Sequence, residues 1–181
     1  LTAFLREGGP WHRIFHTICV FMPPGSRKSM KASIFDKLPE DQLFDDLTPE
    51  NLSIAAAKTD KKKWTLFIFD DVQDKFKGPC ETQLSRLMCN RRHNNLCIAF
   101  VSQSYKKMSK ICRGVISDFF IFRVSKEELR YIYDEHMSLQ KSQLRGLQQF
   151  WKRQCLHGNQ GDFLYLNVNS SEMFFNWDRL H

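Results

Sequence analysis

Two adjacent aspartates at the end of an apolar run are the residues with the clearest capacity for chemistry. Asp70 and Asp71 directly follow the segment WTLFIF (64–69). Neighbouring carboxylates repel each other unless a cation shares their site. Their oxygens suit Mg²⁺, a hard cation that takes few protein carboxylates and keeps several of its waters. The pair therefore predicts a magnesium site, with two solvated strand-end carboxylates as the simpler alternative.

An acid directly after a hydrophobic strand is also the Walker B arrangement of P-loop NTPases. In that arrangement Asp70 would hold Mg²⁺ through water, and Asp71 would orient or deprotonate the water that attacks the γ-phosphate of ATP. Gln103 follows the next apolar run, LCIAFV (96–101). If the two runs pair as strands, the Gln103 amide would lie beside the aspartates and could sense the γ-phosphate. An ordinary strand-end amide is the alternative.

A phosphate-binding loop would be the natural partner of these acids, but the printed sequence contains no G-x-x-x-x-G-K-[ST]. The segment PPGSRKS (23–29) has a single glycine, and Arg27 stands where a second glycine would be needed for close backbone approach. We interpret it as a surface loop. A helical pattern at 1–7 stops at Gly-Gly-Pro (8–10), and no capping residue precedes Leu1. We therefore expect a helix that is truncated at its N-terminus. In the complete helix, a phosphate-binding loop would directly precede the first turn.

The elements that must position these residues follow from hydrophobic periodicity and from turn residues. Thr48 is expected to cap one helix, and Ser125 and Glu128 are expected to form a capping box at another. The predicted strands are 14–22, 64–69, 96–104, 118–124 and two short strands joined by Asn-Ser-Ser within 161–180. The predicted helices are 48–58, 80–93, 125–137 and 142–155.

Continuous apolar strands alternating with amphipathic helices are typical of an α/β domain with a mostly parallel sheet. Active sites in such sheets lie at the carboxyl ends of the strands, where the aspartates and Gln103 fall. The 181 residues suit a single domain, 1–181. Residues 1–124 would form its core, with the Walker B and sensor strands, and residues 125–181 would add helices and short strands.

Composition narrows the functional class. The formal net charge of +7 favours a polyanionic partner without naming it. The apolar runs are too short to cross a membrane, and the start of the sequence has no signal-peptide pattern. Six cysteines without a C-x-x-C pair indicate reduced thiols in an intracellular protein. We therefore expect neither a secreted nor a transmembrane protein.

Three segments together resemble a known family. LFIFDDV (66–72), RLMCNRRHNNLCIAFVSQSY (86–105) and the pieces KICRG and DFFIFRV (within 110–124) are similar to the DNA-packaging ATPases of large DNA viruses, the poxvirus-type members of the FtsK/HerA superfamily. The resemblance covers about residues 1–124. It implies a three-layer, RecA-like (ASCE) P-loop NTPase core, with ATP and Mg²⁺ as cofactors. The absence of a Walker A motif from the printed sequence departs from the family pattern.

The resemblance also implies roles for basic residues. Packaging motors are rings in which an arginine reaches the neighbouring subunit's nucleotide. Arg91 and Arg92 are the candidates, with the favourable dipole at a helix end as the alternative explanation. The cations after the sensor strand could contact DNA phosphates without reading sequence, or could simply be solvated. These cations are Lys106, Lys107, Lys110 and Arg113.

The function implied is an ATP-driven translocase that packages double-stranded viral DNA into a capsid. Its expected partners are double-stranded DNA, identical subunits in a ring of five or six, and capsid or portal proteins. Its expected location is the host cytoplasm or viral factory, or the virion. Two alternatives stay open: another P-loop ATPase, such as a helicase or an AAA-type regulator, and a catalytically dead viral remnant without a P-loop.

Overall fold

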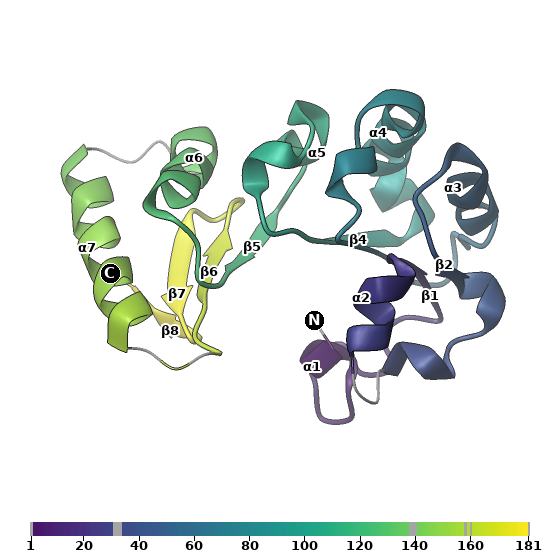
Figure 1. Ribbon diagram of the computed structural model, residues 1–181, viewed down its shortest axis with the longest axis horizontal. Coiled ribbons are helices and arrows are strands. Elements are labelled where there is room, and N and C mark those ends of the chain that lie inside the picture. Colours follow the sequence, from purple (N-terminus) through teal and green to yellow (C-terminus); the bar gives the residue numbers. More distant parts are fainter. Residues whose placement is uncertain (1, 31–33, 138–140, 158, 160, 181) are drawn as a thin grey trace. The chain divides into compact units, whose positions relative to one another are not determined.

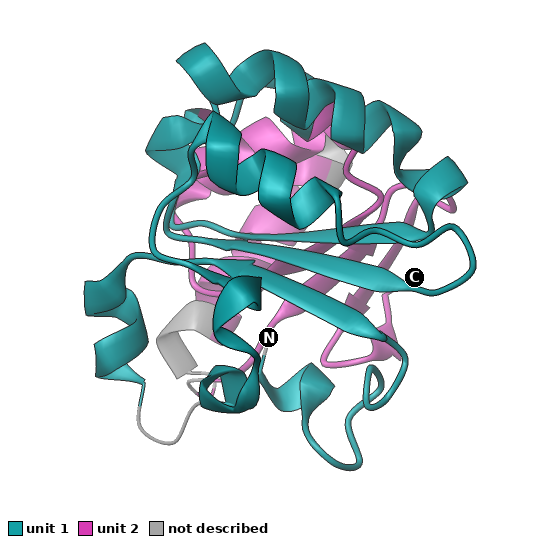
Figure 2. Ribbon diagram, turned by 90° about the vertical axis from the view of Figure 1, so that its right-hand side faces the viewer, with its two compact units in different colours: residues 1–103, 107–112 teal, residues 104–106, 113–181 magenta. Residues whose placement is uncertain are grey.

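The computed structural model describes residues 2–30, 34–137, 141–157, 159 and 161–180 (Figure 1). Its residues group into two compact units (Figure 2). Unit 1 comprises Leu1–Gln103 and Lys107–Cys112, and unit 2 comprises Ser104–Lys106 and Arg113–His181. The chain therefore passes from one unit to the other directly after Gln103.

Unit 1 is built on a parallel four-stranded sheet in the order β2-β1-β3-β4 (Figure 1). Its strands are β1 (Thr17–Phe21), β2 (Leu43–Phe44), β3 (Thr65–Asp70) and β4 (Leu96–Val101). Its α-helices are α1 (Thr2–Leu5), α2 (Pro24–Ser29), α3 (Pro49–Ala56) and α4 (Glu81–Asn90), and α5 (Lys110–Gly114) begins in it. Short 3-10 turns lie at Ile34–Lys37, Glu40–Gln42, Gln73–Lys75, Gly78–Cys80 and Arg91–Asn94, with a further one at Tyr105–Lys107.

Both faces of this sheet are buried by apolar side chains. On one face the ring of Phe69 stacks on those of Phe21 and Phe100, with centroids 4.8 and 5.4 Å apart. On the other face Leu66 and Ile68 belong to a mixed cluster with Val20, Met22 and Phe35. Figure 2 shows helices of unit 1 above and below the strands. Burial on both faces explains why β3 is a continuous apolar run rather than an alternating one.

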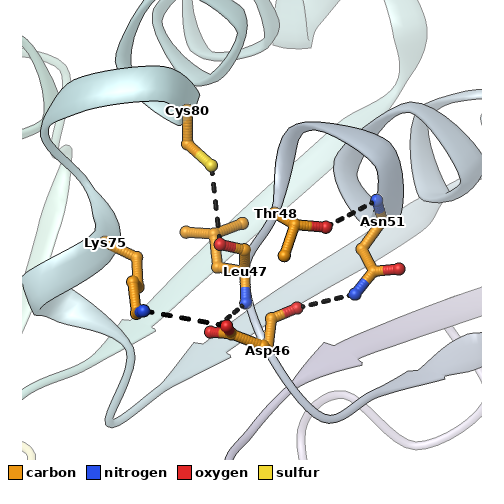
Figure 3. Close-up of polar contacts among 6 residues, drawn as sticks. All are labelled: Asp46, Leu47, Thr48, Asn51, Lys75 and Cys80. Carbon is orange, nitrogen blue, oxygen red and sulfur yellow. Dashed lines mark hydrogen bonds and ion pairs between the residues drawn. The ribbon is translucent and has the colours of Figure 1, made fainter.

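A polar cluster holds the loop that follows β3 (Figure 3). The carboxylate of Asp46 accepts a hydrogen bond from Leu47 N at 2.8 Å and lies 3.7 Å from Lys75 Nζ. The thiol of Cys80 donates to Leu47 O at 3.5 Å. The segment after the aspartates is thus tied to the segment between β2 and α3.

Unit 2 contains an antiparallel sheet in the order β5-β6-β7-β8. The strands are β5 (Asp118–Ile121), β6 (Leu164–Asn167), β7 (Glu172–Phe175) and β8 (Asp178–Arg179), and the helices are α6 (Lys126–His136) and α7 (Lys141–His157). Leu129 on α6, Trp151 on α7 and Leu164 on β6 meet in one buried cluster. The antiparallel pairing of β5 with β6 was not expected from the sequence.

The predicted helix starts are confirmed, with one difference. Thr48 Oγ1 accepts a hydrogen bond from Asn51 N at 3.1 Å, and Ser125 Oγ accepts one from Glu128 N at 3.1 Å. The capping box is only half formed, because the Glu128 carboxylate instead accepts hydrogen bonds from the Ser104 hydroxyl and from the backbone N–H of Tyr105. A tertiary partner has replaced the local one.

Two other local predictions are wrong in part. Residues 23–29, interpreted as a surface loop, contain the helix α2, which begins with Pro24 in the first turn, where proline is well tolerated. The strand expected at 14–22 is shorter, because Arg13 has a positive φ of 58° and residues 10–14 form turns. The three-layer α/β class itself is confirmed by the parallel sheet and by the structural comparisons below. In the described part of the chain, every helix is too short or too polar for a membrane span.

Candidate nucleotide site

The candidate site lies at the carboxyl edge of the parallel sheet of unit 1. Asp70 is the last residue of β3 and is in register with Val101, the last residue of β4. Asp71 follows, and its backbone N–H donates to Val101 O at 3.3 Å. The two strands predicted to carry the acids and Gln103 are therefore direct, parallel neighbours, as the proposed sensor arrangement requires.

Asp71 has a strained backbone. Its φ of 57° is in the left-handed region, which non-glycine residues adopt rarely and aspartate more readily than most. Its carboxylate oxygens have long contacts: Ser26 Oγ lies 3.5 Å from Oδ2, and Gln73 Nε2 lies 3.4 Å from Oδ1. Strain of this kind persists where the surrounding structure enforces it, and it concentrates at functional sites.

A hollow of about 210 Å³ opens beside the acids. Its lining residues are Ser26, Asp70, Asp71, Val101, Ser102 and Gln103, none of which is cationic. Burial raises the pKa of Asp70, and the negative charge of Asp71 raises it further. Two carboxylates thus share a partly buried site without a protein cation among the residues that line it, which favours a cation supplied from outside.

The donor set of this hollow fits Mg²⁺. The chemistry is all oxygen: two carboxylates, the hydroxyls of Ser26 and Ser102, and the Gln103 amide. Mg²⁺ is usually bound through one or two carboxylates together with waters and substrate phosphates. Within the described ranges, no cluster of three or more His, Cys, Asp or Glu side chains forms a dedicated metal cage. A site completed by water and phosphate is the arrangement that these residues can support.

The candidate arginines lie at the opposite edge of the sheet. Arg91 and Arg92 follow α4 in a 3-10 turn just before β4 begins, whereas the acids lie where β3 ends. Arg91 Nη1 donates to Met88 O at 2.9 Å, at the end of α4. Arg92 is exposed. Neither arginine can therefore act on the acids of its own sheet edge, and a role toward a neighbouring subunit stays a prediction.

The candidate DNA cations separate into two groups. Lys107 and Lys110 are exposed in unit 1. In unit 2, Lys106 Nζ lies 3.5 Å from the centre of the Tyr131 ring, and Arg113 Nε lies 3.2 Å from Glu135 Oε2. The Arg113 side chain is only 16% exposed, so the structure does not support it as a free contact for DNA phosphate.

Two residues of this site were missed in the sequence. Ser26 belongs to the segment interpreted as a loop, and Gln73 lies in the 3-10 turn after the acids. A signal for Ser26 existed: its segment directly follows an apolar strand, and parallel strands end at one edge of the sheet. No local pattern distinguishes Gln73, whose Oε1 is buried without a hydrogen-bond partner in the described structure.

Solved structures with this fold include a viral packaging enzyme. The genome packaging NTPase B204 of Sulfolobus turreted icosahedral virus 2, in complex with AMPPCP, has a TM-score of 0.64 and 16% identity, over 91% of this chain and 84% of that chain. Its complex with ATP-gammaS gives 0.61 and 16%, over 88% and 80%. B204 described as the DNA-packaging ATPase of Sulfolobus Turreted Icosahedral Virus gives 0.57 and 15%, over 88% and 81%. At these identities the likeness establishes the fold.

The sequence comparisons identify the family. A search among curated proteins finds no match. The pattern of the family described as Poxvirus A32 protein matches residues 46–155, which is more than half of the 181 residues. The matched range contains both aspartates and every other site residue predicted from the sequence. The resemblance to viral packaging ATPases is thereby confirmed, and the chain belongs to the Poxvirus A32 protein family.

Proposed function

We propose that this chain carries the Walker B and sensor half of an ATP-hydrolysing motor that packages double-stranded viral DNA. The observation that carries the proposal is the convergence of Asp70, Asp71 and Gln103 on one hollow at the carboxyl edge of a parallel sheet. Family membership and the NTPase fold support the same function. ATP hydrolysis, its coupling to DNA movement and the assembly of a ring are parts of the proposal.

The roles of the residues follow from their positions. Asp70, the last residue of β3, is suited to hold Mg²⁺ through water. Asp71 is suited to orient the attacking water and to take its proton, since its carboxylate faces the same hollow. Gln103 is suited to sense the γ-phosphate from the neighbouring strand. Mg²⁺, when bound, would neutralise charge on the phosphate oxygens during transfer.

Two further groups complete the proposal for an assembled motor. Arg92, exposed at the opposite edge of the sheet, is the better candidate for an arginine that reaches a neighbouring subunit, because the Arg91 side chain donates a hydrogen bond to Met88 O of α4. The proposed DNA contacts are Lys106, Lys107 and Lys110. Such contacts would bind DNA of any sequence and weaken as salt rises. The site of action would be the infected cell or the virion.

The test is steady-state ATP hydrolysis by the intact protein in the presence of Mg²⁺, with and without linear double-stranded DNA. We expect turnover that requires Mg²⁺ and rises with DNA of any sequence. We also expect the stimulation of ATP turnover by DNA to be lost between low and high salt.

Each other result assigns the chain differently. Turnover that ignores DNA would contradict a packaging motor and favour another P-loop ATPase. Absence of turnover, in a protein that is folded, would favour a remnant that keeps the fold without the reaction.

A further inference from the structure

A second hollow lies entirely within unit 2, where α6 and α7 pack against each other (Figure 1). Its volume is about 440 Å³, and the apolar part of its lining is Val124, Leu129 and Trp151. Leu129 and Trp151 belong to the buried core cluster of the unit. The fold itself therefore holds this part of the wall in place. The remaining side chains that line the hollow are polar or charged.

One face of α7 supplies most of the polar lining. The spacing i, i+3, i+4 and i+7 is typical of residues on a single helical face. It is followed here by Arg145, Gln148, Gln149 and Lys152. Both cations and Gln149 are exposed. Their polar ends are therefore accessible to a ligand from solvent.

The hollow has a surplus of positive charge. Lys126, the first residue of α6, adds a third cation to Arg145 and Lys152. The acids of the same turn of α6, Glu127 and Glu128, do not line the hollow. Within the described ranges none of the three cations forms an ion pair, and the sequence of α7 contains no Asp or Glu. Three cations without a protein counter-charge favour an anionic ligand.

We propose that this hollow, the cationic pocket, binds phosphate groups of a DNA backbone. Arg, Lys and Gln side chains are common ligands of DNA phosphates and sugars, and such contacts position DNA without reading its sequence. Arg145 and Lys152 are seven residues apart, about 10 Å along the helix, which suits successive phosphates of a chain better than one isolated phosphate. The inference rests on the proposed function, because it gives the proposed DNA partner a contact on unit 2.

The test measures the affinity of the intact protein for linear double-stranded DNA, by fluorescence anisotropy without ATP, over a series of salt concentrations. It compares Arg145→Gln with Arg153→Gln. Both changes remove one exposed arginine from α7, but only Arg145 lines the cationic pocket. The two variants thus have the same net charge and differ only in where the charge is lost.

We expect Arg145→Gln to lower the affinity for DNA of any sequence by about tenfold, and to reduce the slope of log K against log salt by about 1. The double variant Arg145→Gln with Lys152→Gln should reduce this slope by about 2. Arg153→Gln should change the affinity by less than about twofold. Melting temperatures should stay close to that of the wild type in all variants, because the substituted side chains are exposed.

Free phosphate compounds share the chemistry of a DNA backbone, so a second measurement separates the two. Binding of pyrophosphate is followed by calorimetry at matched ionic strength, and we expect it to be much weaker than binding of DNA. Tight pyrophosphate binding that Arg145→Gln abolishes, with the affinity for DNA unchanged, would overturn the proposal and assign the pocket to a small phosphate compound.

The other contrary results are distinct. Equal losses of DNA affinity in Arg145→Gln and Arg153→Gln would overturn the proposal, because net charge alone would then explain them. A wild-type protein that does not bind DNA would overturn it as well. If DNA binds through the cationic pocket but does not stimulate ATP turnover, the proposed motor function fails and the pocket assignment stands.

Discussion

The two strand-end carboxylates of unit 1 and two carboxylates on α6 of unit 2 are satisfied to very different degrees. In unit 1, Asp71 has a positive φ and polar contacts of 3.4 and 3.5 Å, and burial raises the pKa of Asp70. In unit 2, Glu128 and Glu135 accept hydrogen bonds of 2.6 to 3.1 Å from well-placed donors. The acids of unit 2 are stabilised by the protein itself. Asp70 and Asp71 of unit 1 lack such close partners, as expected where a ligand completes the site.

The two sheets show a corresponding difference between the units. The parallel sheet of unit 1 places the ends of its four strands at one edge and so gathers residues distant in sequence. The antiparallel sheet of unit 2 joins near neighbours in sequence from β6 to β8. Unit 1 is thus organised around the edge that carries the candidate site, and unit 2 around a core and a polar network that hold α6 and the segment after β4. The following experiments test this contrast.

The largest expected effect concerns Asp71. Asp71→Asn keeps the size of the side chain but removes the base, so we expect ATP turnover to fall by about 10²-fold or more, with nucleotide binding retained. Asp74 is exposed and lies three residues further on, so Asp74→Asn is the matched control. We expect this variant to hydrolyse ATP at the normal rate. Equal turnover in both variants would mean that the strained acid has no catalytic part.

The core of each unit can be disrupted separately. Phe69→Ala should cost about 3–5 kcal/mol and Leu129→Ala about 2–5 kcal/mol, because both side chains are fully buried. Urea unfolding can be followed by tryptophan fluorescence in variants that keep the tryptophans of one unit only. These are Trp11 and Trp64 in unit 1, and Trp151 and Trp177 in unit 2.

The single domain predicted for 1–181 requires that either substitution shift both sets of signals together. Two separate transitions, each sensitive to the substitution in its own unit, would show that the units unfold independently.

The helix caps offer a smaller and more symmetrical test. Thr48→Ala in unit 1 and Ser125→Ala in unit 2 each remove one capping hydrogen bond and should cost about 1 kcal/mol of unfolding free energy. The exposed Thr82→Ala in α4 should change it by less than about 0.5 kcal/mol. A cost for Ser125→Ala far above that for Thr48→Ala would indicate that the cap also supports the Glu128 contacts.

The smallest effect is a pH-dependent change at Asp70. The pKa of Asp70 is raised in the folded protein, so its ionisation destabilises the folded state. This destabilisation is absent below the ordinary pKa of 3.8 and fully present at neutral pH. Without Mg²⁺ and nucleotide, Asp70→Asn should therefore raise the melting temperature at neutral pH and have little effect below pH 3.8. A lower melting temperature at neutral pH would show that the ionised Asp70 already has a stabilising partner.

Several parts of the site could be predicted because their signals are local. The apolar run before Asp70, the run before Gln103 and the cap at Thr48 each depend on residues adjacent in sequence. The helix α2 was missed because Pro24 and Gly25 are turn residues in most contexts, although proline also suits the first turn of a helix. The capping box was overestimated because Glu128 has a better partner than its own helix end.

The sequence by itself determined which strands end in the candidate site residues, because a fully buried parallel strand must be apolar and its acids must lie at its end. It also identified the family. Only the tertiary structure decided that Ser26 and Gln73 flank Asp71, that β5 pairs with β6, and that Glu128 holds the residues after Gln103. These contacts join residues up to 49 positions apart, from Asp118 to Asn167, and the hydrophobic period that reveals a helix or a strand carries no information about such distant partners.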